Sequence, residues 1–321
     1  MFSVAQLIPI LPQGYADRCV ELCGIKRWRG IKTAEDLMQL SLFHLLNGCT
    51  LIEISQIAKS ARIADISDVA FMDRFASCGK WFESISKELS HGLVANYEKP
   101  ACLQGYRVVA FDASDVAEKG RSSRIYRLHY GIDIFTLSAV SYKITTNKVG
   151  EKLENFSLAK GDLAIADRAY GTINSIDYCL NNNADFIFRL RTNCFRVYNA
   201  EGEVIDIVSH ISHLEHEQST EISAFVHKDN RTIPLRICVL KKSKSDCEKS
   251  DKKLKRRASR KQQELSETTK SFNEYTVVAT SLPSEVSANE VLGIYRYRWQ
   301  IENYFKRLKS IMDLGELPKK R

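Results

Sequence analysis

The chain has 321 residues, of which 44% are hydrophobic and 27% are charged, and its formal net charge at pH 7 is +8. This length accommodates two domains, or one domain with a large insertion, and the apolar content supports a hydrophobic core. No long apolar run and no N-terminal basic stretch followed by an apolar segment occurs, which argues against a membrane span and a signal peptide.

The nine cysteines are scattered and show neither a CxxC pair nor the Cys and His spacing of a zinc site. We interpret them as reduced, mostly buried thiols of a cytoplasmic protein. His210, His213 and His216 recur at helical spacing, and a polar loop or helix surface explains them better than a metal site does.

Residues 1–100 are predicted to form a helical N-terminal region. The segment Thr33–Leu46 begins with the capping residues Thr33 and Asp36 and continues with helical periodicity. Shorter helices are expected at Leu51–Lys59, at Asp68–Ala76 with Ser67 as its N-cap, and at Ser84–Val94. Such a bundle is compatible with binding of DNA ends and equally with packing or dimerisation, because no helix-turn-helix pattern decides between them.

Residues 101–190 alternate strand and helix patterns, which favours an α/β fold with a mixed sheet and helices on both faces. The expected strands are Arg107–Asp112, Arg127–Phe135, Ala139–Thr145, Asp162–Asp167 and Asp185–Leu190. One helix is expected near Gly150–Phe156 and another after Asp167. Three strands followed by helix, strand, helix and strand fit the first part of an RNase H-like catalytic core, in which the first and fourth strands are neighbours.

Residues 191–275 are predicted to be a β-rich insertion, since far more chain separates Asp167 from the last helix than one βα unit needs. Expected strands are Arg196–Val208, Thr220–Val226 and Arg231–Lys241, with turns at 201–202 and 229–230. Residues 276–321 would complete the core: Tyr275–Ser281 returns as its last strand, and Ser287 caps the final helix.

A basic stretch lies within the predicted insertion. Lys241–Gln263 contains eleven Lys or Arg and three acidic residues, so it carries a charge of +8 and the rest of the chain is close to neutral. A local patch of this kind favours a polyanionic partner and strongly salt-dependent binding. The alternative is a helical or disordered charged segment with no partner.

Two aspartates end predicted strands. Val108, Val109 and Phe111 lead into Asp112, and the run from Leu163 to Ala166 leads into Asp167. In open α/β sheets, catalytic side chains collect at strand ends. Aspartate also starts turns and caps helices, so Asp167 is alternatively an N-cap for Ile173–Leu180, and Asp115 competes with Asp112 for the first role.

Five polar residues share one face of the predicted last helix and lie within about 80° of its circumference: Tyr295, Arg298, Glu302, Lys306 and Lys309. An apolar stripe beside them is expected to be buried: Ile294, Ile301, Phe305, Leu308 and Met312. One carboxylate among cations suits a metal ion next to a phosphate. The alternative is a helix with ordinary ion pairs between residues three or four positions apart.

Asp112, Asp167 and Glu302 together supply two strand carboxylates and one helix carboxylate. Hard cations such as Mg²⁺ prefer carboxylate oxygen, and two-metal sites use such groups to activate a nucleophile and to stabilise a leaving oxygen. Mn²⁺ also suits oxygen ligands and is a possible replacement.

These residues resemble the signature of DDE transposases of bacterial insertion sequences, of the insertion-sequence-four type. That signature is Tyr, two residues, Arg, three residues, Glu, six residues and Lys, and Tyr295, Arg298, Glu302 and Lys309 have this spacing. The sequences FDAS at 111–114 and DRAYG at 167–171 resemble the segments around the family's first and second Asp. The resemblance extends from about residue 100 to the C-terminus.

The resemblance implies that Asp112, Asp167 and Glu302 form the catalytic, metal-binding triad, with Mg²⁺ or possibly Mn²⁺. It also implies residues that contact DNA near the scissile phosphate: Tyr295, Arg298, Lys306, Lys309 and Arg168. The implied reaction cuts an insertion-sequence end and joins its 3′-hydroxyl to target DNA. The implied partners are double-stranded terminal repeats and target DNA, bound by a homodimer in the bacterial cytoplasm at the nucleoid.

Two rival interpretations stay open at the level of sequence. One is a nuclease of the same fold that only hydrolyses DNA. The other is a truncated, inactive DNA-binding remnant or regulator, because the chain stops at Arg321, nineteen residues after Glu302, whereas members of the family usually continue with further helices.

Overall fold

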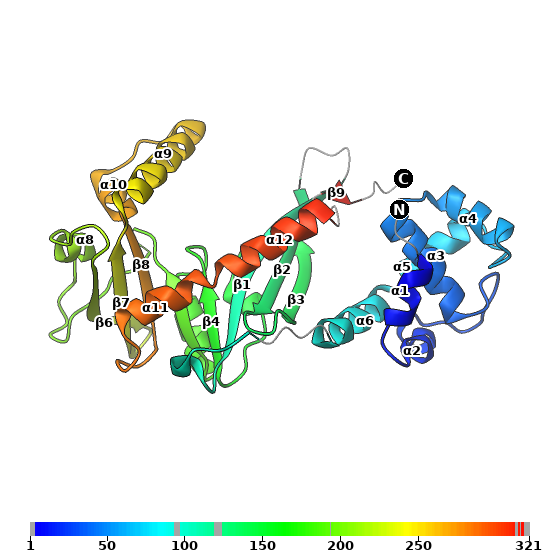
Figure 1. Cartoon of the computed structure of the whole chain (residues 1–321), viewed down its shortest axis with the longest axis horizontal. Coiled ribbons are helices and arrows are strands. Elements are labelled where there is room, and N and C mark those ends of the chain that lie inside the picture. Colours follow the sequence, from blue (N-terminus) through cyan, green and yellow to red (C-terminus); the bar gives the residue numbers. More distant parts are fainter. Residues whose placement is uncertain are drawn as a thin grey trace. The chain divides into compact units, whose positions relative to one another are not determined.

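The computed structural model describes residues 4–92, 97–118, 124–192, 194–311, 314 and 316–317. The chain divides into two compact units, one formed by residues 1–94 with 318–321 and the other by residues 95–317 (Figure 1). No helix in the described part of the chain is both long and apolar enough to cross a membrane.

The N-terminal unit is helical, as predicted. Its described helices are α1 (Val4–Leu7), η1 (Ile8–Ile10), α2 (Tyr15–Leu22), α3 (Ala34–Asn47), α4 (Leu51–Ser60), α5 (Asp68–Ala76) and α6 (Gly79–Gly92). Thr33 and Ser67 cap α3 and α5 as predicted, because their hydroxyls accept hydrogen bonds from backbone N–H groups of the first turn. Helix α6 begins before the predicted Ser84, and residues 93–94 of that prediction lie outside the described residues. Phe71 and Trp81 are fully buried at the centre of the unit.

The second unit is built on one mixed sheet. Its strands are β1 (Arg107–Glu118), β2 (Arg124–Asp133), β3 (Ala139–Thr146), β4 (Asp162–Ala166), β5 (Asp185–Arg189), β6 (Ser219–Lys228), β7 (Arg231–Lys241), β8 (Tyr275–Thr280) and β9 (Glu316–Leu317). The order across the sheet is β3-β2-β1-β4-β5-β8-β7-β6, with the short β9 paired to β1. Strands β1, β4 and β5 are parallel to one another, whereas β2, β3, β6, β7 and β8 pair antiparallel with their neighbours. This arrangement is consistent with the predicted RNase H-like core.

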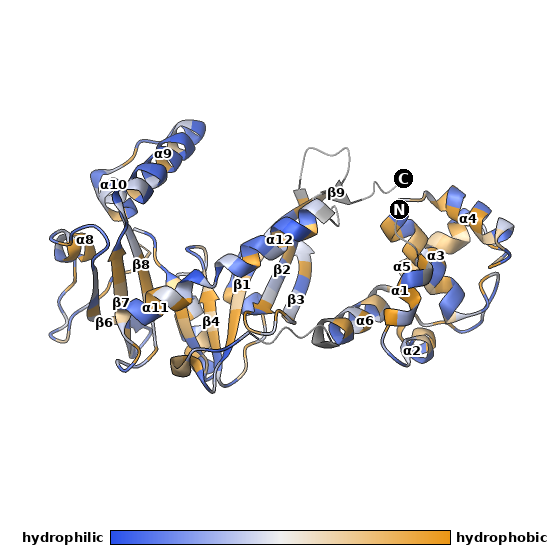
Figure 2. Ribbon diagram, in the orientation of Figure 1, coloured by the Kyte–Doolittle hydropathy of each residue, from blue (hydrophilic) through white to orange (hydrophobic). Residues whose placement is uncertain are grey.

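Helices cover both faces of the sheet. The helical elements of this unit are η2 (Ala101–Leu103), η3 (Leu153–Asn155), α7 (Ile173–Asn181), α8 (Ile207–Ile211), α9 (Lys244–Lys261), α10 (Glu267–Asn273), α11 (Ala288–Arg296) and α12 (Trp299–Ile311). Residues of α7 belong to the apolar cluster on one face, and residues of α11 and α12 belong to the cluster on the other face. The central strands are apolar along most of their length, whereas α9 and α12 are largely hydrophilic (Figure 2).

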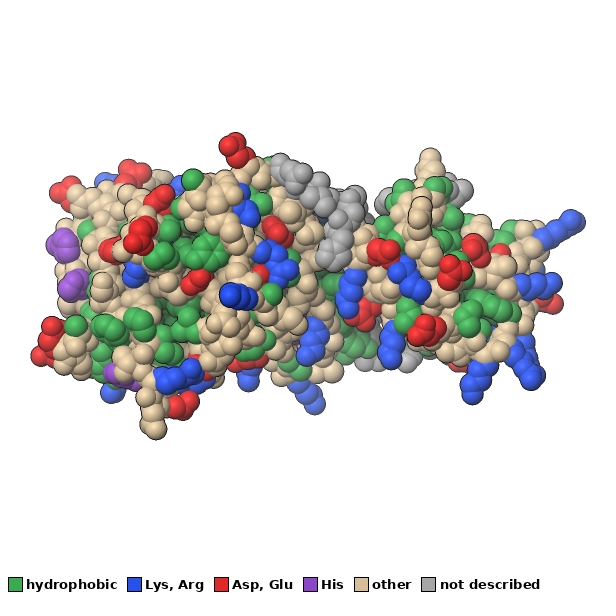
Figure 3. All heavy atoms as spheres, turned by 90° about the horizontal axis from the view of Figure 1, so that it is seen from below, with side chains coloured by type: hydrophobic (Ala, Val, Ile, Leu, Met, Phe, Trp, Pro, Cys, Tyr) green, Lys and Arg blue, Asp and Glu red, His purple; other side chains and the backbone are tan. Residues whose placement is uncertain are grey.

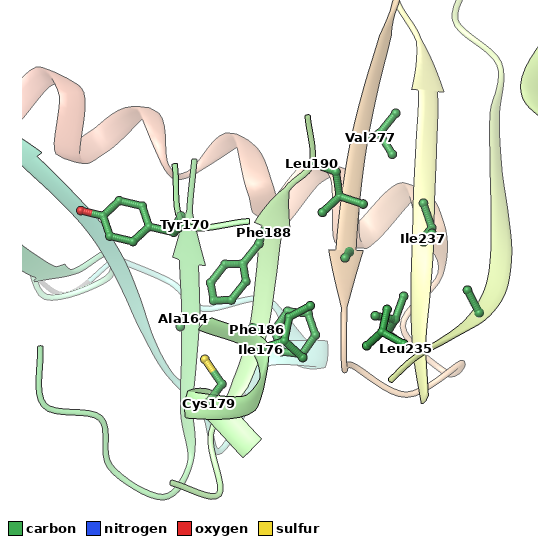
Figure 4. Packing of buried hydrophobic residues seen from close by; sticks show 14 of the residues in the cluster. Ala164, Tyr170, Ile176, Cys179, Phe186, Phe188, Leu190, Leu235, Ile237 and Val277 are labelled. Atoms are coloured by element: carbon green, nitrogen blue, oxygen red, sulfur yellow. The ribbon is translucent and has the colours of Figure 1, made fainter. Parts of the chain in front are cut away.

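Alternation along the strands decides which side chain belongs to which face. In β1, Val109 and Phe111 join the α7 cluster, whereas Val108 and Ala110 join the α11–α12 cluster. The α7 cluster continues across β5 to β8 and β7, where Phe186, Phe188 and Leu190 lie near side chains of the last strands (Figure 4). The core is therefore continuous from one end of the sheet to the other.

Several predicted elements differ from the structure. Arg196–Val208 is not a strand: Tyr198 makes only isolated bridges, and the chain enters α8 at Ile207. The helix predicted near Gly150–Phe156 is reduced to the single turn η3. The basic stretch forms helix α9, capped by Ser243. The strands β6 and β7, predicted for the stretch 191–275, extend the main sheet because β7 pairs with β8.

Candidate active site

Asp112 and Asp167 lie next to each other on neighbouring parallel strands. In the pairing of β1 with β4, Phe111 lies opposite Ala166. The next residue in each segment is an aspartate, so Asp112 and Asp167 are neighbours as well. Both side chains continue the alternation that puts Val108, Ala110, Leu163 and Ile165 on the α11–α12 face. The two carboxylates therefore share one face of the sheet, as the predicted side-by-side position of their strands requires.

Burial and mutual repulsion act on the Asp112 carboxyl. Burial raises the pKa of Asp112 to about 7, and the charge of Asp167 adds to this rise. Two effects oppose it: the N–H of Ala113 donates a hydrogen bond to Oδ1 at 2.8 Å, and Arg298 brings a positive charge nearby. Asp167 accepts a hydrogen bond from the N–H of Ala169 at 2.8 Å, which folds the chain into a turn after β4. The carboxyl pair is thus close enough to interact.

The structure resolves two alternatives for the aspartates. Helix α7 is capped by Thr172, whose hydroxyl accepts a hydrogen bond from the N–H of Ser175, so Asp167 is not its N-cap. Asp115 forms an ion pair with Arg127 at 2.8 Å, and its position in β1 puts its side chain on the α7 face. The geometry favours Asp112 over Asp115 as the partner of Asp167.

The predicted single last helix is divided in two, although Arg298 still contacts both Tyr295 and Glu302. α11 ends at Arg296 and α12 begins at Trp299. The N–H groups of Tyr297 and Arg298 bond to carbonyls three residues earlier, which tightens the chain into a 3₁₀-type turn. Tyr295 therefore lies on α11, Arg298 lies in the turn, and Glu302, Lys306 and Lys309 lie on α12.

The apolar stripe is buried where it is described. Ile294, Ile301 and Phe305 are at most 6% exposed and pack on the sheet, and Leu308 is partly buried. Met312, the last residue of the predicted stripe, lies outside the described residues. The stripe holds both helices against the face that carries the aspartates.

Arg298 connects the helix carboxylate to the aspartates. Its guanidinium donates a hydrogen bond to Oε1 of Glu302 at 2.7 Å, so the predicted ion pair between them is present. Burial acts to lower the pKa of Arg298, but the nearby Tyr295, Glu302 and Asp167 outweigh burial and raise it. Arg298 is 15% exposed and Glu302 is 42% exposed. One buried cation thus lies among the carboxylates Asp112, Asp167 and Glu302.

One polar atom of this cation and one of the neighbouring Tyr295 have no hydrogen-bond partner among the described residues. The hydroxyl of Tyr295, which is 7% exposed, and Nε of Arg298 are buried without a hydrogen bond. A buried donor left unpaired costs roughly 1–3 kcal/mol, which favours a site that a ligand completes. Lys306 and Lys309 are exposed on α12.

Further positive charge surrounds Asp167, and part of it was missed by sequence reasoning. Burial and the neighbouring Arg189 lower the pKa of Arg168 to about 10. Burial together with Arg189 and Arg168 lowers the pKa of Lys242 to about 8. Nε of Arg168 and Nε of Arg189 are buried without partners among the described residues. Arg189 is the last residue of β5, and Asp167 directly follows β4. The position of Arg189 at a strand end is the sequence feature from which its place in the site could have been predicted.

A pocket of about 210 Å³ lies beside these cations, between the turn after β4 and helices α9 and α10. Its lining includes Arg168, Arg191 and Thr269. Like charges this close repel one another unless an anion lies between them. The site therefore combines an acidic pair with an adjoining basic region suited to phosphate.

The comparison with protein families decides what kind of site this is. Residues 103–321, which include both aspartates and both helices, match the family model described as "Transposase DDE domain". The chain belongs to this family. It is therefore an enzyme that catalyses DNA cleavage and strand transfer.

The transposase is similar to proteins of known mobile elements. It is 28% identical over 304 residues, 91% of this chain and 80% of the relative, to the transposase for insertion sequence element IS421 of Escherichia coli. It is equally similar, over 303 residues, to the InsL protein for insertion sequence element IS186A of Escherichia coli K12. A transposase for IS231F of Bacillus thuringiensis subsp. israelensis is 25% identical over 175 residues, 49% of this chain and 36% of the relative.

DDE transposases generally use divalent metal ions, and the carboxylate groups of this transposase are the type of ligand that such ions bind. Asp112 and Asp167 offer adjacent carboxylate oxygens, which hard cations prefer. In the described part of the chain, no three acidic, His or Cys side chains converge closely enough to hold a metal ion. Oε1 of Glu302 accepts a hydrogen bond from the guanidinium of Arg298.

The raised pKa of Asp112 predicts a pH dependence for the metal-free transposase. Because the folded-state pKa is about 7 against an ordinary value of 3.8, the folded chain binds the extra proton between these values. Stability is therefore expected to fall as pH rises from about 4 to about 7, by an amount on the order of a few kcal/mol at most. Melting temperatures of the wild type and Asp112→Asn, compared across this range, isolate the contribution. Parallel pH profiles for the two proteins would contradict the assignment.

Proposed function

We propose that this transposase cuts DNA at the ends of an insertion sequence and joins the exposed 3′-hydroxyl to target DNA. The observation that carries the proposal is the pairing of Asp112 and Asp167 on one sheet face, under the helix that bears Glu302. The similarity to transposases for insertion sequence elements supports this substrate. The Tyr-Arg-Glu-Lys spacing supports assignment to the insertion-sequence-four type.

Asp112, Asp167 and Glu302 would hold the divalent cations, Mg²⁺ or Mn²⁺. When bound, such ions lower the pKa of a water or hydroxyl nucleophile and stabilise the leaving oxygen of the phosphodiester. The residues of the chain orient the carboxylates and the DNA. Oε1 of Glu302 accepts a hydrogen bond from Arg298, so Oε2 is the oxygen left to bind a cation, and the remaining N–H groups of Arg298 can contact a phosphate.

The cations and the tyrosine around the acids would hold the DNA near the scissile phosphate. Tyr295 and Arg298 have unpaired polar atoms beside the carboxylates, and Arg168 follows Asp167 directly. Lys306 and Lys309 are exposed and can reach phosphates farther along the strand. Arg189 and Lys242 add positive charge to the same region, and α9 carries most of the basic stretch, so a DNA backbone is the matching partner.

We propose that the N-terminal helical region contributes to binding of the DNA ends. Lys26, Arg27, Arg29 and Lys32 are exposed within one short loop between α2 and α3. Arg74 fixes this loop, because its guanidinium donates to the Arg27 carbonyl at 3.2 Å and lies over the ring of Trp28. Lys and Arg side chains protrude from this unit at several places, interspersed with Asp and Glu side chains (right side of Figure 3).

Gly30 allows the same loop to lie close to the backbone at Asp65. Its φ of +76° suits glycine, and a Cβ atom there would lie 2.6 Å from the carbonyl oxygen of Asp65. The loop thus presents its four cations from a fixed backbone. Because the cations are held in place before binding, less conformational entropy is lost when a phosphate backbone is bound.

Reversing two charges of this loop tests its role. The double variant Arg27→Glu/Arg29→Glu is expected to weaken DNA-end binding and to reduce the slope of log affinity against log salt by about two, one for each lost phosphate contact. The matched control Lys80→Glu/Lys160→Glu changes the net charge equally at exposed positions outside the loop. Equal salt slopes for the two variants, measured by fluorescence anisotropy, would remove the loop from the interface.

The test of the function is cleavage of labelled DNA that carries the element's own terminal repeat and flank, with and without Mg²⁺. Metal-dependent nicking at the repeat boundary followed by joining to a target duplex is the expected result. Nicking without joining would favour a nuclease that only hydrolyses DNA, and binding without nicking would favour a regulator.

We further propose that the active form is a homodimer on double-stranded DNA in the bacterial cytoplasm, at the nucleoid. Scattering measurements on the DNA complex test the stoichiometry.

A further inference from the structure

One row of side chains runs across four strands of the sheet at the level of the aspartates. Tyr142 on β3 is opposite Tyr130 on β2, and Tyr130 is opposite Asp112 on β1. On the other side of β1, the neighbour of Asp112 is Asp167, directly after β4. Directly opposite residues of paired strands put their side chains on the same face. Two tyrosines and two aspartates thus form a single row beneath α12.

Tyr130 connects this row to the helix that bears Glu302. Its hydroxyl donates a hydrogen bond to the hydroxyl of Tyr304 on α12 at 2.9 Å. The two rings are stacked, with centroids 4.7 Å apart and planes inclined by 18°. Tyr130 also meets the edge of Phe305, at 6.2 Å between centroids, and is 8% exposed. The contact is therefore both directional and largely shielded from water.

Tyr304 and Glu302 emerge on opposite flanks of α12. They are two residues apart, so successive steps of about 100° separate them by roughly 160° around the helix. Ile301 and Phe305 lie between these flanks and face the sheet. Tyr304 therefore holds the flank over β2, and Glu302 occupies the flank toward Asp112 and Asp167. A roll of the helix about its axis that breaks the tyrosine contact also moves Glu302.

The size of this motion matters for a metal site. A side chain about 5–6 Å from the helix axis moves roughly 2 Å when the helix rolls by about 20°. Metal–ligand distances tolerate deviations of only about 0.2 Å. Ile301 and Phe305 hold the helix against the sheet by close packing, and the hydrogen bond of Tyr304 adds a directional contact on one flank. In the part of the chain that the structure describes, the hydrogen bonding of α12 to the strands runs through Tyr304.

We propose that Tyr130 and Tyr304 are positioning residues that fix the roll of α12 and thereby the distance of Glu302 from Asp112 and Asp167. This inference rests on the proposed metal-binding role of the three carboxylates. The pair touches neither substrate nor metal and acts through Glu302. Its effect is on metal affinity and on the metal-dependent step, and DNA binding does not depend on it.

The double variant Tyr130→Phe/Tyr304→Phe tests the proposal, because it removes both hydroxyls, keeps both rings and leaves no unpaired hydroxyl behind. The matched control is Tyr178→Phe, which removes a tyrosine hydrogen bond to the carbonyl of Phe156 at 2.8 Å on the other face of the sheet. Mn²⁺ binding is measured by paramagnetic resonance titration, and cleavage is measured as a function of Mg²⁺ concentration.

The expected result is a metal affinity about tenfold or more below that of the wild type in the double variant, with cleavage recovering at high metal concentration. DNA-end affinity stays at the wild-type level, and Tyr178→Phe behaves as the wild type. Wild-type Mn²⁺ affinity in a folded double variant would overturn the positioning role while the carboxylate assignment stands. If Glu302→Ala also leaves Mn²⁺ affinity unchanged, the metal role of Glu302 fails, and the positioning role fails with it.

Discussion

Replacing Asp112 or Asp167 by asparagine is expected to lower the rate of DNA strand cleavage by roughly three orders of magnitude or more, with DNA-end binding retained. Asparagine keeps the shape of the side chain but removes the charge that a divalent cation needs. Metal ions stabilise such transition states by several kcal/mol, and about 1.4 kcal/mol corresponds to a factor of ten in rate. Single-turnover cleavage of labelled terminal-repeat DNA, with binding measured in parallel, gives both quantities.

Asp115→Asn is the matched control for these variants. Asp115 lies on the same strand, three residues after Asp112, but its carboxylate pairs with Arg127 on the α7 face. Its replacement is expected to affect stability modestly and to leave most of the cleavage rate. Metal-dependent cleavage at near wild-type rate in Asp112→Asn, together with its loss in Asp115→Asn, would exchange the roles of the two residues.

Glu302→Gln is expected to reduce cleavage to a similar extent, but it differs in one respect. Glutamine still accepts a hydrogen bond from Arg298, although it can no longer neutralise the guanidinium. Metal binding should weaken, whereas binding of DNA phosphate should be equal or tighter, because one negative charge has left the site.

Gly171→Ala is expected to displace the turn after Asp167, lowering the unfolding free energy by about 1–3 kcal/mol and the cleavage rate by tenfold or more. A Cβ atom at this position would lie 2.4 Å from the carbonyl oxygen of Arg189 and 3.4 Å from its carbonyl carbon. Both are backbone atoms at the end of β5, so they cannot move aside as a flexible side chain can. Urea unfolding and single-turnover cleavage measure the two effects.

The control for this substitution is Gly293→Ala on α11, where no atom lies within 4 Å of the added Cβ. Alanine favours a helix by up to about 1 kcal/mol over glycine, so this variant should be as stable as the wild type or more so. A Gly171→Ala variant with unchanged stability and cleavage would show that the turn can move away from the end of β5 without loss of folding free energy.

Local signals predicted much of what the structure contains. The caps Thr33, Ser67 and Ser287 begin helices where predicted, because capping depends on residues a few positions apart. The apolar run before Asp167 predicted a strand that ends directly before this residue, whereas β1 continues past Asp112 to Glu118 and Asp112 lies within the strand. The adjacency of the two aspartates followed from the parallel pairing that alternating strands and helices favour.

Features that depend on distant parts of the chain were not predictable from spacing. The pairing of Tyr130 with Tyr304 joins residues 174 positions apart, and neither residue has a local pattern that marks it. The break after Arg296 is also invisible, because a 3₁₀-type turn preserves nearly the same periodicity over one turn. Arg196–Val208 alternates like a strand, but it makes only isolated bridges, between Tyr198 and Val204 and between Tyr198 and Phe225.

The position of β8 between β5 and β7 has a consequence for synthesis on the ribosome. Strand β5 ends at Arg189 and its second neighbour begins at Tyr275, so 85 residues, 190–274, must be translated before that neighbour exists. At typical elongation rates of 5–20 residues per second, the apolar edge of β5 waits roughly 4–17 s for its partner. During this interval the nascent chain offers an unpaired strand edge to other chains or to chaperones. We therefore expect the yield of folded protein to depend on elongation speed through this stretch and on chaperone supply.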